Sequence, residues 1–192
     1  MIIELVGVAT GLLCVVLLGR QNIATWPLGL AYALVSLVVF YQNGVFGQVL
    51  LHVVFVGLNA WGWYAWMTQA KQHTEHVRRL DLTLAGVLLG VFVVALAAVE
   101  YGINRPFGGV GGWLDSVVAA GSLIAIWMQS KRYLDVWVLW FLLNLGSLVL
   151  YARIGLYWYV GLYLIYQVLA VWGFAQWRRD LMERSEPSSP LA

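Results

Sequence analysis

The chain has 192 residues, of which 62% are hydrophobic and only 10% are charged, whereas soluble domains average about 45–50% apolar and about 25% charged residues. A soluble core of this size cannot bury so many apolar side chains, so the surplus must face a lipid bilayer. This composition excludes a soluble enzyme and a secreted disulfide scaffold, and the formal net charge of +2 is too small to indicate a nucleic-acid partner. The single cysteine, Cys14, lies in an apolar run and is expected to be a small core or lipid-facing residue.

Seven apolar stretches follow one another along the chain, and each has the length of a membrane-spanning helix. They are Ile3–Gly19, Ala24–Gln42, Val45–Thr68, Leu82–Tyr101, Trp113–Gln129, Asp135–Ala152 and Leu156–Trp177. Helices are expected because backbone polar groups in lipid must be satisfied within the segment, and the alternation typical of a membrane barrel is missing. The first stretch has no basic region before it and no evident cleavage site after it, so we expect a retained span; a cleaved signal peptide is the alternative.

The loops between these stretches differ strongly in positive charge. One side carries Arg20, Lys71, Arg78, Arg79, Lys131, Arg132, Arg178, Arg179 and Arg184, and the other carries only Arg105 and Arg153. Because Lys and Arg accumulate in cytoplasmic loops, the N-terminus is expected outside and the C-terminus in the cytoplasm. The polar residues 180–192 are expected to form a disordered cytoplasmic tail.

The sequence repeats itself at an offset of 111 positions. The matching residues include Trp26 with Trp137, Ser36 with Ser147, Gly44 with Gly155, Trp61 with Trp172, Gly62 with Gly173 and Trp66 with Trp177. The repeat predicts a three-helix unit in residues 1–70, a connector helix with its loops in residues 71–110, and a second unit in residues 111–179. A shift of four spans preserves direction, so the expected fold is an all-α membrane protein with seven transmembrane helices in a parallel 3+1+3 repeat. Transporters built from such repeats bind substrate at the repeat interface, near the middle of the membrane.

The sixth span reads DVWVLWFLLNLGSLVLY and carries two indoles and an amide on one helical face. Trp137, Trp140 and Asn144 stand at positions i, i+3 and i+7. Tryptophans can stack on a flat ring, more strongly if that ring is cationic, and an amide both donates and accepts hydrogen bonds. We therefore expect a substrate site here. The alternative is that Trp137 belongs to the interfacial aromatic belt and Asn144 joins two helices.

Polar and aromatic residues of two further spans are expected to complete this site. The third span supplies Gln48, His52, Phe55 and Asn59, and the seventh span supplies Tyr163 and Gln167, with Tyr166 on the same face. Several polar side chains on one face of a lipid-buried helix usually look into a cavity. For His52, an interior hydrogen-bonded histidine is an equal alternative, and the tyrosines of the last span are also compatible with an interfacial belt.

Several chemistries have no residues to support them. The spans contain no deep Lys or Arg, so an anionic substrate would lack a counter-charge and the site should favour a neutral or cationic solute. The sequence contains no phosphate-binding loop, metal-ligand cluster or activated nucleophile, so we expect neither an enzyme nor a cofactor or metal. The acids Glu4, Glu100 and Asp115 stand near span ends, which argues against an ion-coupled pump.

Asp115 opens the fifth span directly after a cluster of glycines and faces the extracellular side in the expected orientation. We expect water to reach its carboxylate, which would attract a cationic solute and bond across the entrance as a gate. Glu4 occupies the matching place in the first unit, so it is expected to play the same part. The alternative is a first-turn acid that stabilises the helix dipole.

Three runs of the sequence resemble the PnuC family of bacterial vitamin transporters. They are FGQVLLHVVFVGLNAWGWYAWMTQ, GWLDSVVAAGSLIAIWMQSKRYLDVWVLWFLLNLGSLVLYARIGLY and LAVWGFAQWRR. The resemblance covers about residues 20–179, and its most specific part is the WxxWxxxN pattern of the sixth span followed by Gly155, Leu156 and Tyr157. Trp137, Trp140, Asn144 and Asn59 match the family's site pattern, whereas His52 stands where many members carry glutamine.

The resemblance implies a fold similar to that of doubled semi-SWEET transporters and a homotrimer in the bacterial inner membrane. It also implies facilitated diffusion of an unphosphorylated vitamin, which a cytoplasmic kinase then traps. The vitamin is nicotinamide riboside in the PnuC transporters themselves and thiamine or riboflavin in close relatives. Nicotinamide riboside contains a flat pyridinium ring, which suits stacked tryptophans and amides, but thiamine is also a flat cation. A membrane receptor that binds a ligand without passing it is the alternative from another class.

Overall fold

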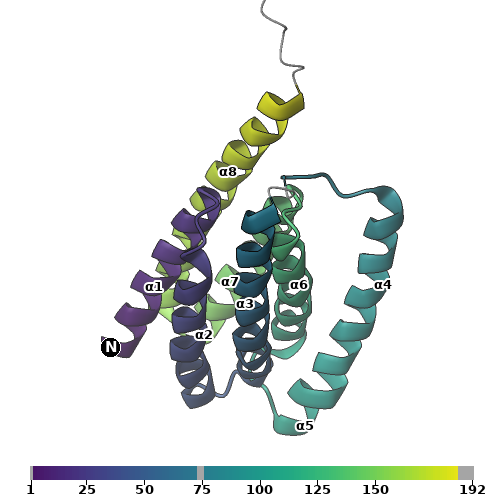
Figure 1. Ribbon diagram of the computed structural model, residues 1–192. Coiled ribbons are helices and arrows are strands. Elements are labelled where there is room, and N and C mark those ends of the chain that lie inside the picture. The colour runs from purple at the N-terminus through teal and green to yellow at the C-terminus, as the bar shows by residue number, and fades with distance from the viewer. Residues whose placement is uncertain (1, 73–75, 186–192) are drawn as a thin grey trace, which may run out of the picture.

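The computed structural model describes residues 2–72 and 76–185, with side chains described over residues 6–68 and 76–183. This part of the chain is all α-helical apart from one isolated β-bridge between Arg78 and Tyr133, which confirms the predicted fold class. The long helices are α1 (Ile2–Gly19), α2 (Thr25–Gln42), α3 (Phe46–Gln72), α4 (Leu82–Val99), α6 (Gly112–Ser130), α7 (Val136–Arg153) and α8 (Tyr157–Ser185). A π-helix, η1 (Glu100–Asn104), and a short helix, α5 (Arg105–Phe107), connect α4 with α6 (Figure 1).

The helix ends differ from the predicted spans in three places. The third helix, α3, continues from Thr68 to Gln72. The fourth helix continues beyond Tyr101 as the π-helix η1. The last helix continues to Ser185, so the predicted start of a disordered tail at residue 180 is wrong. The first six residues of the predicted tail extend α8 instead, because Arg178–Ser185 contains neither Gly nor Pro to end the helix. Residues 186–192 of the predicted tail lie outside the described residues.

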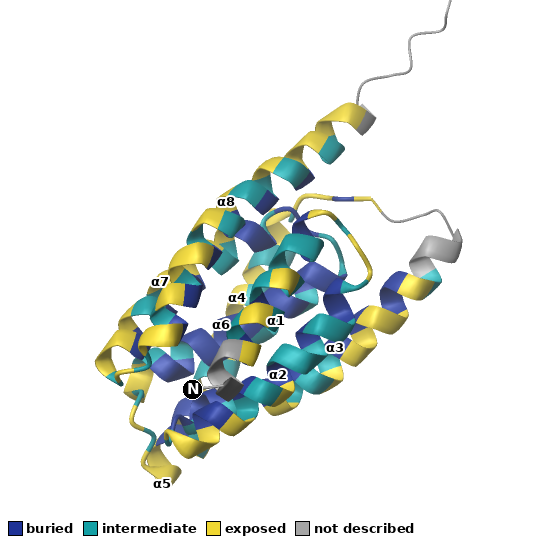
Figure 2. Ribbon diagram, turned by 90° about the vertical axis from the view of Figure 1, so that its left-hand side faces the viewer, coloured by how far each residue is buried: buried dark blue, intermediate teal, exposed yellow. Residues whose placement is uncertain are grey.

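The helices differ in how apolar they are and in how much of each is buried. Among the described residues, five helices are long and apolar enough to cross a membrane, namely α2, α3, α4, α7 and α8, whereas the apolar described part of α1, Val6–Gly19, is shorter. The α6 helix falls outside this set because it carries polar residues that the bundle buries, including Asp115, Ser116, Ser122 and Gln129. The opposite holds for α4, because only 6% of its most apolar stretch is buried. The central α6 therefore depends on protein contacts and the outlying α4 on lipid contacts (Figures 1 and 2).

The two three-helix units pack in the same way. In the first unit α2 lies between α1 and α3, and in the second unit α7 lies between α6 and α8. The units meet through α1 against α8 and α3 against α6, which are equivalent pairs. These contacts close the six helices into a ring, and α4 packs on its outside, against α6 (Figure 1). The 111-residue repeat of the sequence is thus also a repeat of helix packing.

Each unit contains the same arrangement of two tryptophans and a glycine. In the first unit the rings of Trp26 and Trp66 meet edge to face, with centroids 5.4 Å apart and planes at 81°. A Cβ atom on Gly62 would overlap the Trp26 ring, so glycine is what allows the indole to approach the α3 backbone. The equivalent residues of the second unit, with centroids 5.5 Å apart and planes at 90°, are Trp137, Trp177 and Gly173. This packing fixes α2 on α3 and α7 on α8.

Equivalent residues of the two units also touch each other. The rings of Phe40 and Tyr151, 111 positions apart, are stacked with centroids 5.5 Å apart and planes at 10°. At the opposite end of the same helices, Nη1 of Arg132 donates a hydrogen bond to Oε1 of Gln21, also 111 positions away. Residues related by a two-fold axis can meet only close to that axis. An approximate axis therefore runs through the ring from one end to the other.

Replacing Gly62 by Ala tests the tryptophan packing. The added methyl group would displace the fully buried Trp26 ring, so we expect the free energy of unfolding to fall by about 1–3 kcal/mol, as for other overpacked sites. Thermal unfolding in detergent measures the effect. Gly57→Ala in the same helix is the matched control, because its Cβ meets open space and alanine favours the helix by up to about 1 kcal/mol. Equal stability of the two variants would contradict the prediction.

Candidate functional site

A cavity lies on the approximate two-fold axis, inside the ring of six helices. It contains about 810 Å³ of space that protein atoms do not fill, a figure that includes the part open to solvent. All six helices of the ring line it and α4 does not. The lining residues are Cys14, Val15, Leu18, Gly29, Tyr32, Leu51, His52, Phe55, Asn59, Ser122, Ile126, Gln129, Trp137, Trp140, Asn144, Tyr163, Tyr166 and Ala170.

The structure brings together most of the residues that the sequence assigned to a substrate site. Seven of the nine line the cavity: Trp137, Trp140, Asn144, Asn59, His52, Phe55 and Tyr163. Sequence reasoning missed the contribution of α6, where Ser122 and Gln129 face the cavity. These two stand seven residues apart, the same spacing as Trp137 and Asn144. This spacing was therefore a signal in the sequence for a polar face on α6, although no aromatic residue accompanied it.

Two predicted site residues do not line the cavity. Gln48 lies one turn beyond His52 toward the end where Phe40 meets Tyr151, and its amide Nε2 donates to Asp115 instead. Gln167 follows Tyr166 directly, so about 100° of helical rotation turns its side chain away from the cavity that Tyr166 lines. A helical-face pattern gives neither the depth of a residue along the helix nor the exact edge of the face.

The cavity lining is itself repeated. Six pairs of residues 111 positions apart line it together: Val15 with Ile126, Leu18 with Gln129, Gly29 with Trp140, His52 with Tyr163, Phe55 with Tyr166 and Asn59 with Ala170. Within the pairs, side chains of different size and polarity break the symmetry. The residue equivalent to Trp140 is Gly29, and the space that a side chain on Gly29 would take is filled by Oδ1 of Asn59. The site is thus a symmetric frame with an asymmetric lining.

Trp140 is the indole best placed to contact a ligand. Its Nε1 donates to Oε1 of Gln129 at 3.1 Å, which fixes the orientation of the ring while its side chain stays half-buried. Trp137, by contrast, is 2% exposed and packs edge to face on Trp177, so most of its ring belongs to the packing of the second unit. The two indoles that the sequence treated alike therefore have different surroundings.

The polar atoms that face the cavity include both donors and acceptors. Nδ1 of His52 lies 2.7 Å from the backbone oxygen of Gln48 and must carry the proton, which makes the buried Nε2 an acceptor without a partner in the described structure. Asn59 donates through Nδ2 to the oxygen of Phe55 at 2.8 Å, leaving its Oδ1 to accept. The amide of Asn144, 5% exposed, makes no side-chain hydrogen bond to another described residue. Such groups are suited to a ligand with hydroxyl and amide groups.

The cavity lining contains no Lys, Arg, Asp or Glu. Within the described residues there is also no group of three or more His, Cys, Asp and Glu side chains that could hold a metal ion. An anionic ligand would therefore enter this cavity without a counter-charge, at a high desolvation cost. Neutral and cationic ligands fit the lining better.

Asp115 joins the two units near the end of the cavity where Phe40 meets Tyr151. Its carboxylate on α6 accepts hydrogen bonds from the backbone N–H of Gly47 at 3.0 Å and from Nε2 of Gln48 at 2.7 Å, both on α3. The side chain is 0% exposed, so the expectation that water reaches it is wrong in this structure, because α3 covers it. The side chain of Glu4, the other predicted gate residue, lies outside the described residues.

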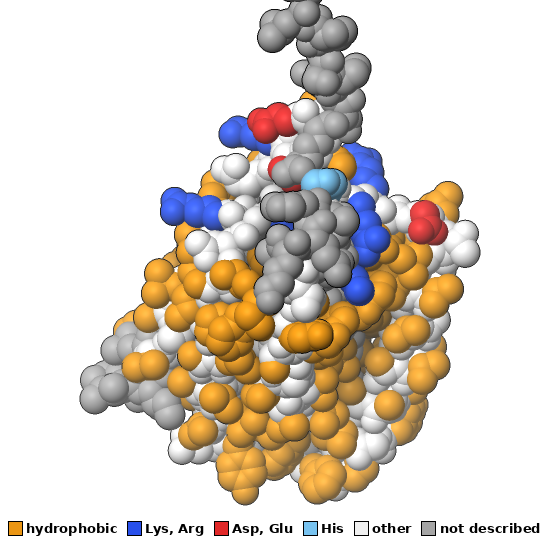
Figure 3. Space-filling model, in the orientation of Figure 1, with side chains coloured by type: hydrophobic (Ala, Val, Ile, Leu, Met, Phe, Trp, Pro, Cys, Tyr) orange, Lys and Arg blue, Asp and Glu red, His pale blue; other side chains and the backbone are white. Residues whose placement is uncertain are grey.

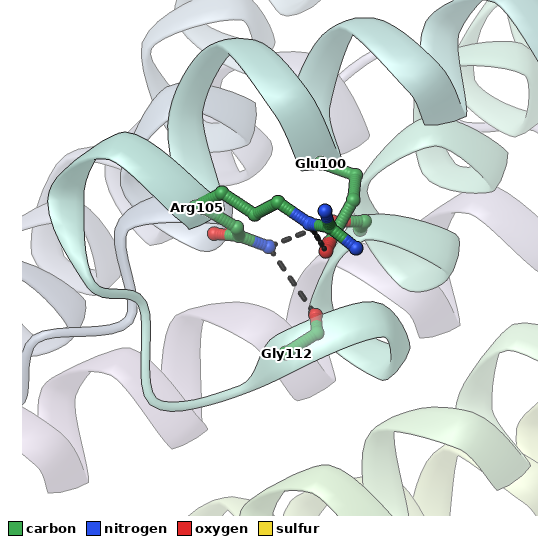
Figure 4. Close-up of polar contacts among 5 residues, drawn as sticks. Glu100, Arg105 and Gly112 are labelled. Atoms are coloured by element: carbon green, nitrogen blue, oxygen red, sulfur yellow. Dashed lines mark hydrogen bonds and ion pairs between the residues drawn. The ribbon is translucent and has the colours of Figure 1, made fainter.

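A polar cluster fastens the connector to α6 beside Asp115 (Figure 4). Oγ of Ser116 donates to Oε2 of the buried Glu100 at 2.7 Å, and Nδ2 of Asn104 donates to Ser116 at 2.7 Å and to the oxygen of Gly112 at 3.3 Å. The exposed Arg105 pairs with Glu100 at 3.1 Å. The π-helical turn of η1 supplies Glu100 and Asn104, and such turns are frequent near functional sites. Residue patterns do not reveal a π-turn, so the sequence indicated no role for Glu100.

Comparison with known proteins places nearly the whole helical region in one family. The family described as nicotinamide mononucleotide transporter matches residues 1–179. The chain is 28% identical to the nicotinamide riboside transporter PnuC of Escherichia coli (strain K12), over 95% of this chain and 87% of that protein. It is 26% identical to the riboflavin/roseoflavin transporter RibM of Streptomyces davaonensis, over 92% and 86%. A crystal structure of the vitamin B3 transporter PnuC shares the fold, with a TM-score of 0.81 at 21% identity over 95% of this chain and 83% of that one.

Replacing Asp115 by Asn tests the bond between the units. An asparagine oxygen can accept one of the two donors, but its Nδ2 would face the other, so we expect the free energy of unfolding to fall by about 1–3 kcal/mol. Thermal unfolding in detergent measures the change. Asp81→Asn is the matched control, because Asp81 caps α4 alone, through Leu84 N–H at 2.8 Å, and Asn caps helices about as well as Asp. If the loss is no greater than that of the control, Asp115 only stabilises the dipole of α6 and does not join the two units.

Proposed function

Because the chain belongs to the nicotinamide mononucleotide transporter family, we propose that it mediates facilitated diffusion of an unphosphorylated vitamin, nicotinamide riboside, across a bacterial inner membrane. The family match confirms the resemblance to PnuC transporters noted in the sequence. The proposal of this substrate rests on the curated relatives and on one observation: a neutral, partly aromatic cavity on the axis between the two units.

The riboside fits the cavity better than the mononucleotide that gives the family its name. The two molecules differ by a phosphate group, and no Lys or Arg lines the cavity to pair with it. The pyridinium ring, by contrast, is a flat cation that gains from stacking on an indole. The proposed substrate is therefore taken up before phosphorylation, and a cytoplasmic kinase traps it afterwards.

Individual side chains suit the parts of this substrate. We propose that the pyridinium ring stacks on Trp140 inside the cavity. The amide of Asn144 and the free Oδ1 of Asn59 then serve the carboxamide and the ribose hydroxyls, with Nε2 of His52 as a further acceptor. Phe55, Tyr163 and Trp137 form the apolar walls. Binding of the ring supplies most of the affinity and the amides supply the selectivity.

The proposed orientation and assembly follow from charge and from the family. Lys and Arg gather at the end of the molecule from which the C-terminal part of α8 projects (Figure 3), so this end is assigned to the cytoplasm and the N-terminus to the outside. Asp115 then lies at the extracellular end, where its bond to α3 acts as an outer gate, with Glu4 in the equivalent place. A homotrimer is proposed from the resemblance to PnuC transporters.

Riboflavin is the second candidate substrate, because RibM matches nearly the whole chain. Riboflavin is flat and carries hydroxyl groups, but its ring system is larger and uncharged. The cavity beside the half-buried Trp140 would have to accept three fused rings. Thiamine, a smaller cation, remains a substrate to compare.

Uptake of radiolabelled nicotinamide riboside into proteoliposomes that contain the purified protein tests the proposal. We expect the label to equilibrate at equal rates with and without proton and sodium gradients, and unlabelled nicotinamide riboside to compete better than riboflavin or thiamine. With the membrane potential clamped, no accumulation above the external concentration is expected. Binding without flux would show a receptor instead, and stronger competition by riboflavin would reassign the substrate.

Replacing Trp140 by Ala should weaken binding about five- to thirtyfold, because a stacking contact to a cation is worth about 1–2 kcal/mol. Asn144→Leu should be as damaging, since the ligand atoms that the amide serves would be left unpaired. Calorimetry in detergent measures both affinities. Trp158→Ala is the matched control, because this α8 tryptophan is 52% exposed on the outside of the ring and should bind as the parent does. Unchanged binding in both site variants would show that this face is structural.

A further inference from the structure

We infer that Gln21 and Arg132 form the cytoplasmic gate of the cavity. The two side chains meet on the approximate two-fold axis, where Nη1 of Arg132 donates to Oε1 of Gln21 at 2.5 Å. Gln21 follows α1 and Arg132 follows α6, so the bond joins the first unit to the second. The inference rests on the transport function proposed above but not on the identity of the substrate.

The pair stands directly beyond the cavity. Leu18 and Gln129, three residues before Gln21 and Arg132, are the last cavity-lining residues of α1 and α6. A solute that leaves the cavity along the axis toward this end therefore meets the pair first. At the other end of the axis the equivalent place is taken by the stacked rings of Phe40 and Tyr151.

The backbone at both positions is held in an unusual conformation. Gln21 has φ 53° and Arg132 has φ 57°, and they are the residues other than glycine that show positive φ in the described chain. Residues other than glycine rarely adopt this left-handed backbone conformation, which costs them about 1 kcal/mol or more. Both units keep it at the same position, and in both it directs the side chain to the axis. Glycine would remove this cost if the side chains had no function at the axis. The turns at the other end of the bundle do use glycine at positive φ, namely Gly44 and Gly155.

Arg132 has a defined position in this closed arrangement. Its guanidinium lies over the ring of Trp66, 4.1 Å from the centroid, and Trp66 packs edge to face on Trp26. The cation is thus bound both to Gln21 and to the tryptophan packing of the first unit. To open this end, Arg132 must leave Gln21, and the loop after α6 must move away from α3.

The native Cys14 provides the test, because it is the single cysteine of the chain and lines the cavity. Inside-out and right-side-out vesicles are treated with membrane-impermeant methanethiosulfonates, one cationic and one anionic, and the purified protein is weighed by mass spectrometry. Arg132→Gln should speed labelling from the cytoplasmic side about fivefold or more with both reagents, because a hydrogen bond to a charged group is lost. Labelling from the outside should not change. Gln21→Glu should slow cytoplasmic labelling with both reagents, since an ion pair replaces the neutral acceptor.

Lys131→Gln is the matched control, because it removes a neighbouring positive charge and leaves the pair intact. Cytoplasmic labelling of this variant should equal that of the parent, and Cys14→Ala should give no label. Opposite effects of Arg132→Gln on the two reagents would show that Arg132 only sets the local potential, and equal rates in the parent, Arg132→Gln and Gln21→Glu would overturn the gate. If Arg132→Gln fails to fold, Gln21→Glu alone decides. Because labelling needs no substrate, a failure of nicotinamide riboside uptake leaves this result standing.

Discussion

The absence of water in the bilayer interior is the constraint on which this fold depends. Every polar side chain at membrane depth has to face the protein or a cavity. The α6 helix, with Asp115, Ser116, Ser122 and Gln129 all buried, can exist only at the centre of the bundle. The α4 helix, almost wholly apolar and exposed, can exist only at its edge. The ring of six helices with one outside follows from this division, and the polar groups that it turns inward form the cavity.

The repeat supplies the frame of the site, and departures from the repeat supply its chemistry. The pairs Trp26 with Trp66 and Trp137 with Trp177 keep both units in the same geometry. Along the cavity, however, the equivalent of Trp140 is Gly29, and the equivalent of Asn59 is Ala170. A symmetric ligand would gain nothing from these differences. A ligand with a flat ring at one side and hydroxyl groups at the other matches them.

The sequence predicted the features that depend on helical periodicity. It did not predict features that depend on how deep a residue lies in the bundle or on which distant residue it contacts. The repeat offset, the helices, and the shared face of Trp137, Trp140 and Asn144 follow from spacing alone. Gln48 shares a face with His52, but spacing does not show that it lies beyond the cavity and bonds to an acid 67 positions away. The same distant bond buries Asp115, which the neighbouring glycines suggested would be open to water.

The two ends of the cavity differ in charge, and this difference affects the entry of a charged solute from each side of the membrane. The lining between them contains no Asp, Glu, Lys or Arg, whereas Asp115 lies near one end and Arg132 at the other. In the orientation proposed above, a cationic solute approaches a carboxylate from outside and a guanidinium from the cytoplasm. Fixed charges at an entrance change the local concentration of a charged solute and its rate of entry. A passive carrier with these ends should take up a cation faster from outside than from inside. The equilibrium distribution stays unchanged, because release through each end is altered by the same factor as entry through that end.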